Sequence, residues 1–425
     1  MLGSLTTEYD FTENLEEANI IIVNTCSFID KAKKESTEAI LNAVEYKDGN
    51  CDVLIVTGCM AEEFKNDILE ELPEVNAVVG TTAYSDITRI VNEAYKGKRE
   101  VYIGNENSNI EEKATRILST PNHYAYIKIA EGCDNCCTYC IIPKLRGKYK
   151  SRKLENIYDE VEELTKKGIK EAILIAQDTT KYGIDIYGKK SLVDLIRELS
   201  KIKELEHIRV LYCYPEDIDD ELINELATNK KLYKYLDIPI QHLSDGILKK
   251  MGRKITYKRI EEIVKKLREK VENITIRTTI IVGFPTETDK DFELLYNRLK
   301  KLKFDHLGVF EYSREKGTPA ARFKEQVSKS VKKKRYEDIM LLQKDITERK
   351  NKKKLKKTFD VVIEGIADDG LFYYGRSEAE APDVDNLIYF TSKEELTIGE
   401  YVKVKILNID DYDLIGEVLW IYQIK

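Results

Sequence analysis

Four cysteines fall within eight residues in the stretch Glu131–Arg152, which reads EGCDNCCTYCIIPKLRGKYKSR. Three of them, Cys133, Cys137 and Cys140, follow a Cys-x3-Cys-x2-Cys spacing, which lets one tight loop aim three thiolates at a common centre. Three thiolates are one too few for a closed tetrahedral zinc site. They suit a four-iron, four-sulfur (4Fe-4S) cluster whose fourth iron stays open to another ligand.

The neighbours of these cysteines leave two alternatives open. A zinc knuckle would need a fourth ligand, and no His or further cysteine stands at ligand spacing downstream. Cys136 could replace Cys137 as the middle ligand, although the spacing favours Cys137. Tyr139 sets an aromatic ring directly before the last cysteine, where its flat face could stack on an adenine.

The composition is typical of a globular protein of the cytoplasm. The 425 residues are enough for two to three domains, and 42% of them are apolar and 34% charged. No stretch approaches the ~18 apolar residues of a membrane helix, and the N-terminus lacks the features of a signal peptide. Eight cysteines in such a chain favour metal or redox chemistry over disulfides.

Residues 1–97 predict an N-terminal α/β domain in which strands and helices alternate. Buried parallel strands are expected at Ile20–Val23, Val53–Val56 and Ala77–Val79, and helices at Lys31–Tyr46 and Met60–Leu72. Two of the strands lead into cysteines, Cys26 and Cys59, and ligands of open α/β sheets gather outside the carboxyl ends of strands. We therefore expect these two cysteines to bind a cluster, with two buried structural cysteines as the alternative.

The start of the sequence predicts that a strand is missing. Residues 1–5 resemble the end of a helix, whereas a domain of this kind should begin with a strand and its own strand-end loop. Cys51 cannot supply the ligand expected from that loop, because it lies across one strand from Cys59, about 26 Å away at ~3.3 Å per residue. We expect the natural reading frame to begin upstream of Met1.

Residues 98–121 predict a linker, and residues 122–330 predict a core of six strand–helix units. The strands are expected at Tyr124–Ala130, Glu171–Ala176, Ile208–Tyr212, Leu236–Ile240, Ile274–Val282 and His306–Tyr312. Such an alternation predicts a parallel, incomplete (β/α)6 barrel. The cysteine loop follows the first strand, so it should lie at the C-terminal mouth, where the active sites of such barrels lie. Gly283, after the fifth strand, would let the backbone approach a ligand there.

The C-terminal part changes character twice. Residues 331–357 predict a basic helical linker, whose lysines either face phosphate groups or simply form a solvated helix face. Residues 358–425 predict five alternating strands and therefore a small OB-like β-barrel. This barrel holds 15 Asp or Glu against five Lys or Arg, a net charge of −10, whereas the first 357 residues carry +3.

These features together resemble the radical-SAM methylthiotransferases over essentially the whole chain. The stretches VNTCSF, VTGCMA and EGCDNCCTYCIIPKLRG match the cluster motifs of that family. The resemblance implies that Cys133, Cys137 and Cys140 hold the 4Fe-4S cluster that binds and cleaves S-adenosyl-L-methionine (SAM). It implies that Cys26 and Cys59 are two of three ligands of a second, auxiliary 4Fe-4S cluster, whose usual first ligand has no counterpart in this sequence.

The family pattern also implies an order of domains, and the places of three residues in the cysteine loop and after the fifth strand suggest contacts to SAM. It has an N-terminal methylthiotransferase domain, a radical-SAM barrel and a C-terminal TRAM barrel. Tyr139, Gly283 and Phe284 are the expected contacts to SAM. A monomer that needs an electron donor and a sulfur donor, and that has no membrane partner, is expected.

The choice of substrate divides this family. The RimO type modifies the β-carbon of an aspartate in ribosomal protein S-twelve, and the MiaB type modifies a tRNA adenosine. The stretches AQDTTKYGIDIYG, LYCYPE and LDIPIQHLSDGILKKMGR are similar to the RimO type. A barrel of charge −10 would repel RNA and attract a basic ribosomal protein, which favours the same branch. A non-catalytic iron–sulfur RNA-binding protein and a zinc-stabilised structural protein are the alternatives from other classes.

Overall fold

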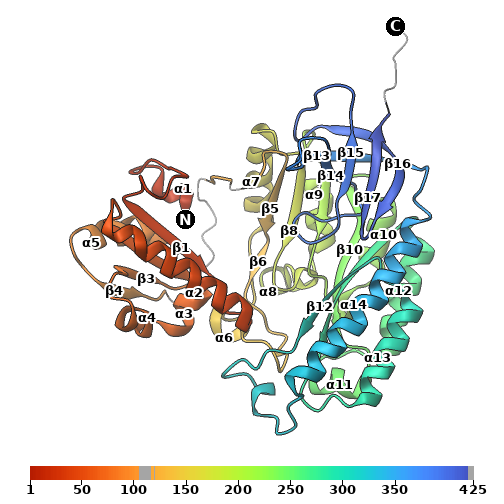
Figure 1. Ribbon diagram of the computed structural model, residues 1–425, viewed down its shortest axis with the longest axis horizontal. Helices are drawn as coiled ribbons and strands as arrows, with labels where there is room; N and C mark the ends of the chain where they lie inside the picture. The colour runs from red at the N-terminus through yellow and green to blue at the C-terminus, as the bar shows by residue number, and fades with distance from the viewer. Residues whose placement is uncertain (105–115, 119, 420–425) are drawn as a thin grey trace. The chain divides into compact units, whose positions relative to one another are not determined.

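The computed structural model of the chain describes residues 1–104, 116–118 and 120–419 (Figure 1). The chain forms two compact units, each assembled from separate stretches of sequence. The first unit combines Met1–Ile117, Glu131–Arg152 and Ser313–Arg322, and the second combines Leu118–Ala130, Lys153–Tyr312 and Phe323–Lys425. The cysteine loop therefore belongs to the unit of the N-terminal sheet.

The first unit is built on a parallel sheet with the strand order β1-β2-β3-β4. Its strands are β1 (Ile20–Thr25), β2 (Val53–Gly58), β3 (Ala77–Val79) and β4 (Glu100–Tyr102). Strand β4 lies in the segment 98–121 that was predicted as a linker. Sequence periodicity could not reveal it, because it has only three residues. All six residues of β2 are buried, as expected for a parallel strand covered on both faces.

Helices cover the two faces of this sheet. Side chains of α2 (Asp30–Glu45), α3 (Cys59–Phe64) and α4 (Asn66–Glu71) pack on one face, around Leu54 and Val56. Side chains of α1 (Leu2–Leu5) and α5 (Ile87–Tyr95) pack on the other face. One helix was expected over Met60–Leu72, but Lys65 adopts φ 45°, which ends α3 and starts α4.

The second unit contains the predicted parallel, incomplete barrel. Its six strands pair in the order β12-β11-β10-β9-β8-β5, and the sheet does not close on itself. The strands are β5 (Tyr124–Lys128), β8 (Glu171–Ile175), β9 (His207–Val210), β10 (Leu232–Gln241), β11 (Thr275–Val282) and β12 (His306–Glu311). The helices between them are α7 (Leu154–Lys166), α8 (Ile184–Tyr187), α9 (Leu192–Leu199), α10 (Asp220–Thr228), α11 (Asp245–Lys250), α12 (Tyr257–Lys270) and α13 (Asp289–Leu302). Two short strands, β6 (Ala130–Glu131) and β7 (Lys150–Ser151), pair at the base of the cysteine loop.

The predicted five-stranded C-terminal barrel is also present. Its strands close in the order β13-β14-β15-β17-β16 around a core that includes Val361, Phe390 and Val404. They are β13 (Thr358–Ile366), β14 (Tyr373–Arg376), β15 (Ile388–Thr391), β16 (Tyr401–Asp410) and β17 (Asp413–Val418), drawn in blue in Figure 1. No helix in the described part of the chain is both long and apolar enough to cross a membrane.

The helix before the barrel, α14 (Lys329–Asn351), carries its positive charge largely in ion pairs. Lys333 and Arg349 pair with acidic residues one turn away on the same helix, and Lys352, directly after the helix, pairs with Glu348. Lys344 pairs with Asp411 of the barrel. These pairs offset part of the positive charge of the helix.

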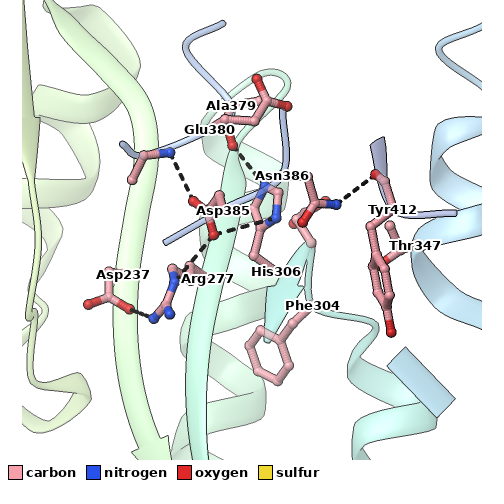
Figure 2. A network of polar contacts seen from close by, with 12 residues as sticks. Asp237, Arg277, Phe304, His306, Thr347, Ala379, Glu380, Asp385, Asn386 and Tyr412 are labelled. Carbon is pink, nitrogen blue, oxygen red and sulfur yellow. Dashed lines mark hydrogen bonds and ion pairs between the residues drawn. The ribbon is translucent and has the colours of Figure 1, made fainter. Parts of the chain in front are cut away.

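The C-terminal barrel holds the sheet of its own unit through residues 377–386, which connect β14 to β15; we call them the docking loop. Its backbone carbonyls accept hydrogen bonds from Arg209 of β9, His306 of β12 and Tyr126 of β5. Its Asp385 carboxylate meets Tyr235 of β10, Arg277 of β11 and His306, as Figure 2 shows in part. A polar sequence thus fills a buried position, because strand side chains satisfy its polar groups.

Candidate iron–sulfur and SAM site

The cysteine loop of the first unit is shaped by close backbone contacts. Gly132 adopts φ 76°, and a Cβ atom there would lie 2.1 Å from the Lys148 carbonyl oxygen. Only glycine fits this approach, which brings the start and the end of the loop together. Next to it, the Cys133 N–H donates a hydrogen bond to the Gly147 carbonyl (3.3 Å), so the first cysteine is fixed at the base of the loop.

The three spaced cysteines share one environment. Cys133 is 7% exposed and Cys137 is 5% exposed, and the Cys140 N–H donates to the Cys137 carbonyl (3.0 Å). Burial raises the pKa of the Cys140 thiol to about 12, and the nearby Cys137 and Cys133 sulfurs contribute to the rise. Three thiolates held this close repel one another, and iron cations bound between them would stabilise them.

The other residues of the loop lie differently. Cys136 is exposed and adopts φ 49°, so the backbone turns sharply between Cys133 and Cys137. Tyr139 is half-buried beside Cys140. The Thr138 carbonyl accepts a hydrogen bond from Ala320 N–H (2.9 Å), which ties the loop to the 313–322 segment of the same unit.

Cys26 and Cys59 lie at neighbouring strand ends of the same unit. Strands β1 and β2 pair with Thr25 opposite Gly58, so the two cysteines are the next residues along adjacent parallel strands. Gly58 adopts φ 98°, and a Cβ atom there would lie 2.3 Å from the Thr25 carbonyl oxygen. Cys26 is exposed, and its backbone N–H and carbonyl both bond to the Ser36 hydroxyl of α2.

An arginine that the sequence reasoning did not single out connects the two cysteine sites. Arg146 ends α6 (Ile142–Arg146), the short helix after Cys140, and its Nη2 donates to the Cys59 sulfur at 3.3 Å. Its Nη1 pairs with the carboxylate of Glu131. Cys59 also packs against Ile141 and Leu145 of the cysteine loop. The motif IIPKLRG after the last cysteine was the only signal that could have pointed to this contact.

The donor set suits clusters better than a single ion. Within residues 1–104, 116–118 and 120–419, no three His, Cys, Asp or Glu side chains form a group that could hold one metal ion. In an iron–sulfur cluster each corner iron takes its own thiolate, so the ligands surround a cluster rather than one atom. Soft sulfur donors, of which those of Cys59, Cys133 and Cys137 are buried, match that requirement.

The SAM contacts expected from β11 lie in the second unit. Gly283 follows β11 with φ 70° and has the stem of the Lys332 side chain against it. Phe284 is fully buried, with its ring edge-to-face against Tyr312 and Phe323. His242, at the end of β10, is fully buried, and burial lowers its pKa to about 3, so it is neutral.

Comparison with family models divides the chain into three matches. The model of the radical SAM superfamily matches residues 127–299, and that of the TRAM domain matches residues 357–419. A third, described as uncharacterized protein family UPF0004, matches residues 1–80. The UPF0004 match covers β1, β2 and β3 of the N-terminal sheet, and the TRAM match covers the closed barrel.

Among solved structures, a radical S-adenosylmethionine methyltransferase, TsrM from Kitasatospora setae, has a similar fold. With cobalamin and a 4Fe-4S cluster bound, it superposes with a TM-score of 0.52 at 17% identity, over 75% of this chain and 68% of that chain. At this identity the likeness concerns the fold alone.

Three relatives are similar over nearly the full length, and each is named ribosomal protein uS12 methylthiotransferase RimO. They come from Acetivibrio thermocellus (54% identical over 99% of this chain), Clostridium botulinum (50% over 98%) and Clostridium acetobutylicum (46% over 98%). This chain covers 94% of each relative. The chain therefore belongs to the RimO family of radical-SAM methylthiotransferases.

Proposed function

We propose that this protein transfers a methylthio group to an aspartate of ribosomal protein uS12, the protein S-twelve of the small ribosomal subunit. The observation that carries the proposal is the 54% identity to a protein of that name over 99% of the chain. The structure adds a site of the right kind, because one loop carries three cysteines, of which Cys133 and Cys137 are buried and Cys140 is partly buried, and two further cysteines lie at neighbouring strand ends.

Two clusters are part of the proposal. Cys133, Cys137 and Cys140 hold a 4Fe-4S cluster with SAM, and Cys26 and Cys59 supply ligands to a second, sulfur-carrying cluster. When bound, the first cluster supplies the electron that cleaves SAM. The sources of the electron and of the sulfur are a reductant and a sulfur donor of the cytoplasm.

The protein groups around the proposed clusters have separate tasks. Burial of Cys133 and Cys137 keeps water from the sulfurs. Arg146 donates to the Cys59 sulfur and brings a positive charge to a site where thiolates are needed. Hydrogen bonds to cluster sulfurs are one means by which proteins set cluster potentials. Tyr139, the residue directly before Cys140, is expected to contact the ligand of an open iron.

The charge of the C-terminal barrel favours a protein substrate over a tRNA. With 15 acidic and five basic residues beyond position 357, the barrel repels a phosphate backbone. In the basic helix α14, pairing of Lys333, Lys344 and Arg349 with carboxylates offsets part of the positive charge. A basic ribosomal protein would be attracted by the same field.

A competition experiment tests the proposal. The reconstituted enzyme, with SAM and a reductant, is offered uS12 and a tRNA that bears isopentenyl-adenosine, and both are analysed by mass spectrometry. The expected product is uS12 with a methylthio group on one aspartate and an unchanged tRNA. Modification of the tRNA alone would make the protein-substrate assignment wrong. The iron, sulfide and zinc contents of the protein are measured as well. A structural zinc protein would contain zinc and lack iron and sulfide.

A further inference from the structure

We propose that Tyr212, the second residue after β9, is a substrate-positioning residue that contacts the polypeptide substrate. This inference rests on the proposed function, because it takes the substrate to be a protein chain. It concerns a residue outside the cysteine sites and outside the expected SAM contacts.

The first observation is the left-handed backbone conformation at the ends of three neighbouring strands of the second unit. Tyr212 (φ 60°), Gln241 (φ 70°) and Gly283 (φ 70°) stand at the carboxyl ends of β9, β10 and β11, three neighbouring strands. A bulky aromatic residue in this left-handed region is a genuine outlier, since its Cβ crowds the backbone. Such residues cluster at binding and catalytic sites. The carboxyl ends of parallel barrel strands are also where ligands bind.

The second observation is that hydrogen bonds fix both backbone groups of Tyr212. Its N–H donates to Asp237 Oδ2 at 3.1 Å. Its carbonyl accepts from the Thr179 N–H and from the Thr179 hydroxyl, each at 3.1 Å. The strained conformation is therefore imposed by β10 on one side and by the loop after β8 on the other.

The third observation is what this conformation does to the side chain. Leu211 is 5% exposed and Cys213 is 0% exposed, whereas Tyr212 between them is 45% exposed. The left-handed turn thus points one aromatic ring outward from a segment that is otherwise buried. Tyrosine is suited to peptide contact, because it offers a large apolar face and a hydroxyl with few rotamers to restrict.

The fourth observation is a series of contacts that connects Tyr212 to the docking loop. Figure 2 shows the part that runs from Asp237 through Arg277 to Asp385. Asp237 Oδ1 accepts from Arg277 Nη1 at 3.1 Å, and Arg277 Nε lies 3.3 Å from Asp385 Oδ1. Asp385 is itself held by the Tyr235 hydroxyl at 2.6 Å and by the Ala381 N–H at 2.9 Å. A carboxylate of the C-terminal barrel thereby fixes the arginine that orients Asp237.

These contacts have a mechanical consequence. Asp237, Arg277 and Asp385 are all largely buried, and a buried charge is costly when its partner is removed. The docking loop therefore helps to hold the Tyr212 backbone, although Asp385 is remote from it in sequence. The C-terminal barrel thus helps to keep the Tyr212 side chain in the orientation in which it contacts a substrate.

Binding measurements test the inference without needing turnover. Fluorescence anisotropy gives the affinity for a synthetic uS12 peptide that carries the target aspartate, with intact uS12 as the second ligand. Tyr212→Ala should weaken peptide binding roughly tenfold, the loss expected for an aromatic contact residue. Tyr95→Ala removes a ring that is 42% exposed on α5 and should leave the affinity unchanged.

A glycine substitution separates substrate contact from structure. Tyr212→Gly should raise Tm, because glycine adopts φ 60° without strain. It should weaken peptide binding as much as Tyr212→Ala does. A tyrosine that served the fold alone would lower Tm when replaced and would leave the affinity unchanged.

The relay is tested by a double substitution. Asp385→Asn should weaken peptide binding by less than Tyr212→Ala, and the pair should bind no more weakly than Tyr212→Ala alone, because both changes act through one ring. Equal peptide affinity of the wild-type protein and Tyr212→Ala would overturn the inference and leave the proposed function standing. Absence of binding by the wild-type protein to both peptide and intact uS12 would overturn the proposed substrate, and the inference with it.

Discussion

Arg376 of β14 and Glu171 of β8 form a buried ion pair, with 2.5 Å between Nη2 and Oε2. Arg209 of β9 donates to the other oxygen of Glu171 at 2.8 Å. The three side chains are at most 1% exposed. Because a lone buried charge is costly, this cluster fixes the closed barrel to the parallel sheet of its unit.

Replacing Glu171 should therefore be severe. Glu171→Gln leaves the Arg376 and Arg209 guanidinium groups buried without their shared carboxylate, and we expect a loss of about 3–5 kcal/mol in the free energy of unfolding. Denaturant unfolding followed by circular dichroism measures it. Glu162→Gln, which breaks an exposed pair with Lys166 on α7, is the matched control and should cost less than about 0.5 kcal/mol. Similar losses for the two variants would contradict the role given to the cluster.

The same carboxylate should make stability depend on pH. Burial alone would raise the pKa of Glu171, but the Arg376 and Arg209 charges outweigh it and lower the pKa to about 2. An unfolded glutamate titrates near ~4.3, so this stabilisation is present above that pH and is lost as the pH falls toward 2. For the wild-type protein without its clusters, the free energy of unfolding should fall as the pH is lowered from 6 to 2. Glu171→Gln should lack the part of this pH dependence that Glu171 causes. The same pH dependence in both proteins would refute the role given to Glu171.

Loss of one cluster ligand should abolish SAM cleavage. Alanine at Cys133, Cys137 or Cys140 should reduce deoxyadenosine formation under dithionite to background, because each corner iron needs its thiolate. Cys136→Ala should retain cleavage, since that side chain is exposed on the turn between the ligands. Chromatography of the nucleoside products gives the result. Cleavage that survives in Cys137→Ala and disappears in Cys136→Ala would reverse the assignment.

Surface acids of the C-terminal barrel should speed the encounter with uS12. A suitable set is exposed and lies outside the ion pairs of the docking loop, namely Asp368, Asp369, Glu394 and Glu395. Changing all four to the amides should slow association by roughly threefold to tenfold at low salt and leave SAM cleavage unchanged. The difference should fade as the Debye length falls from ~10 Å at 0.1 M to ~3 Å at 1 M salt.

Stopped-flow association rates check this prediction. The control replaces four exposed acids of the first unit, Asp10, Glu13, Glu16 and Glu17. A salt-independent effect, or the same effect from the control set, would show that the barrel charge does not steer the substrate. Asp385 is unsuitable for this test, because its side chain is 1% exposed and supports the sheet.

The amino-acid sequence alone predicts the features that depend on a local pattern. The Cys133, Cys137 and Cys140 spacing is a property of one short loop, and buried parallel strands such as β2 show as unbroken apolar runs. Alternation of strand and helix then predicts a parallel sheet, and the comparisons confirmed the family that the motifs resembled. The net charge of the barrel also needs no coordinates.

Contacts between residues far apart in the sequence become visible only in the tertiary structure. Arg146 reaches the sulfur of Cys59 across 87 positions, and Asp385 meets Arg277 from a loop whose polar sequence is typical of a surface. No periodic sequence pattern predicts either contact, because each depends on a single side chain that packs against residues of other elements. Tyr212 shows the same limit, since nothing in LYCYPE indicates that Asp237 and Thr179 hold its backbone in a left-handed conformation. A pattern predicts an element, but partners far along the chain set the position of each buried charge.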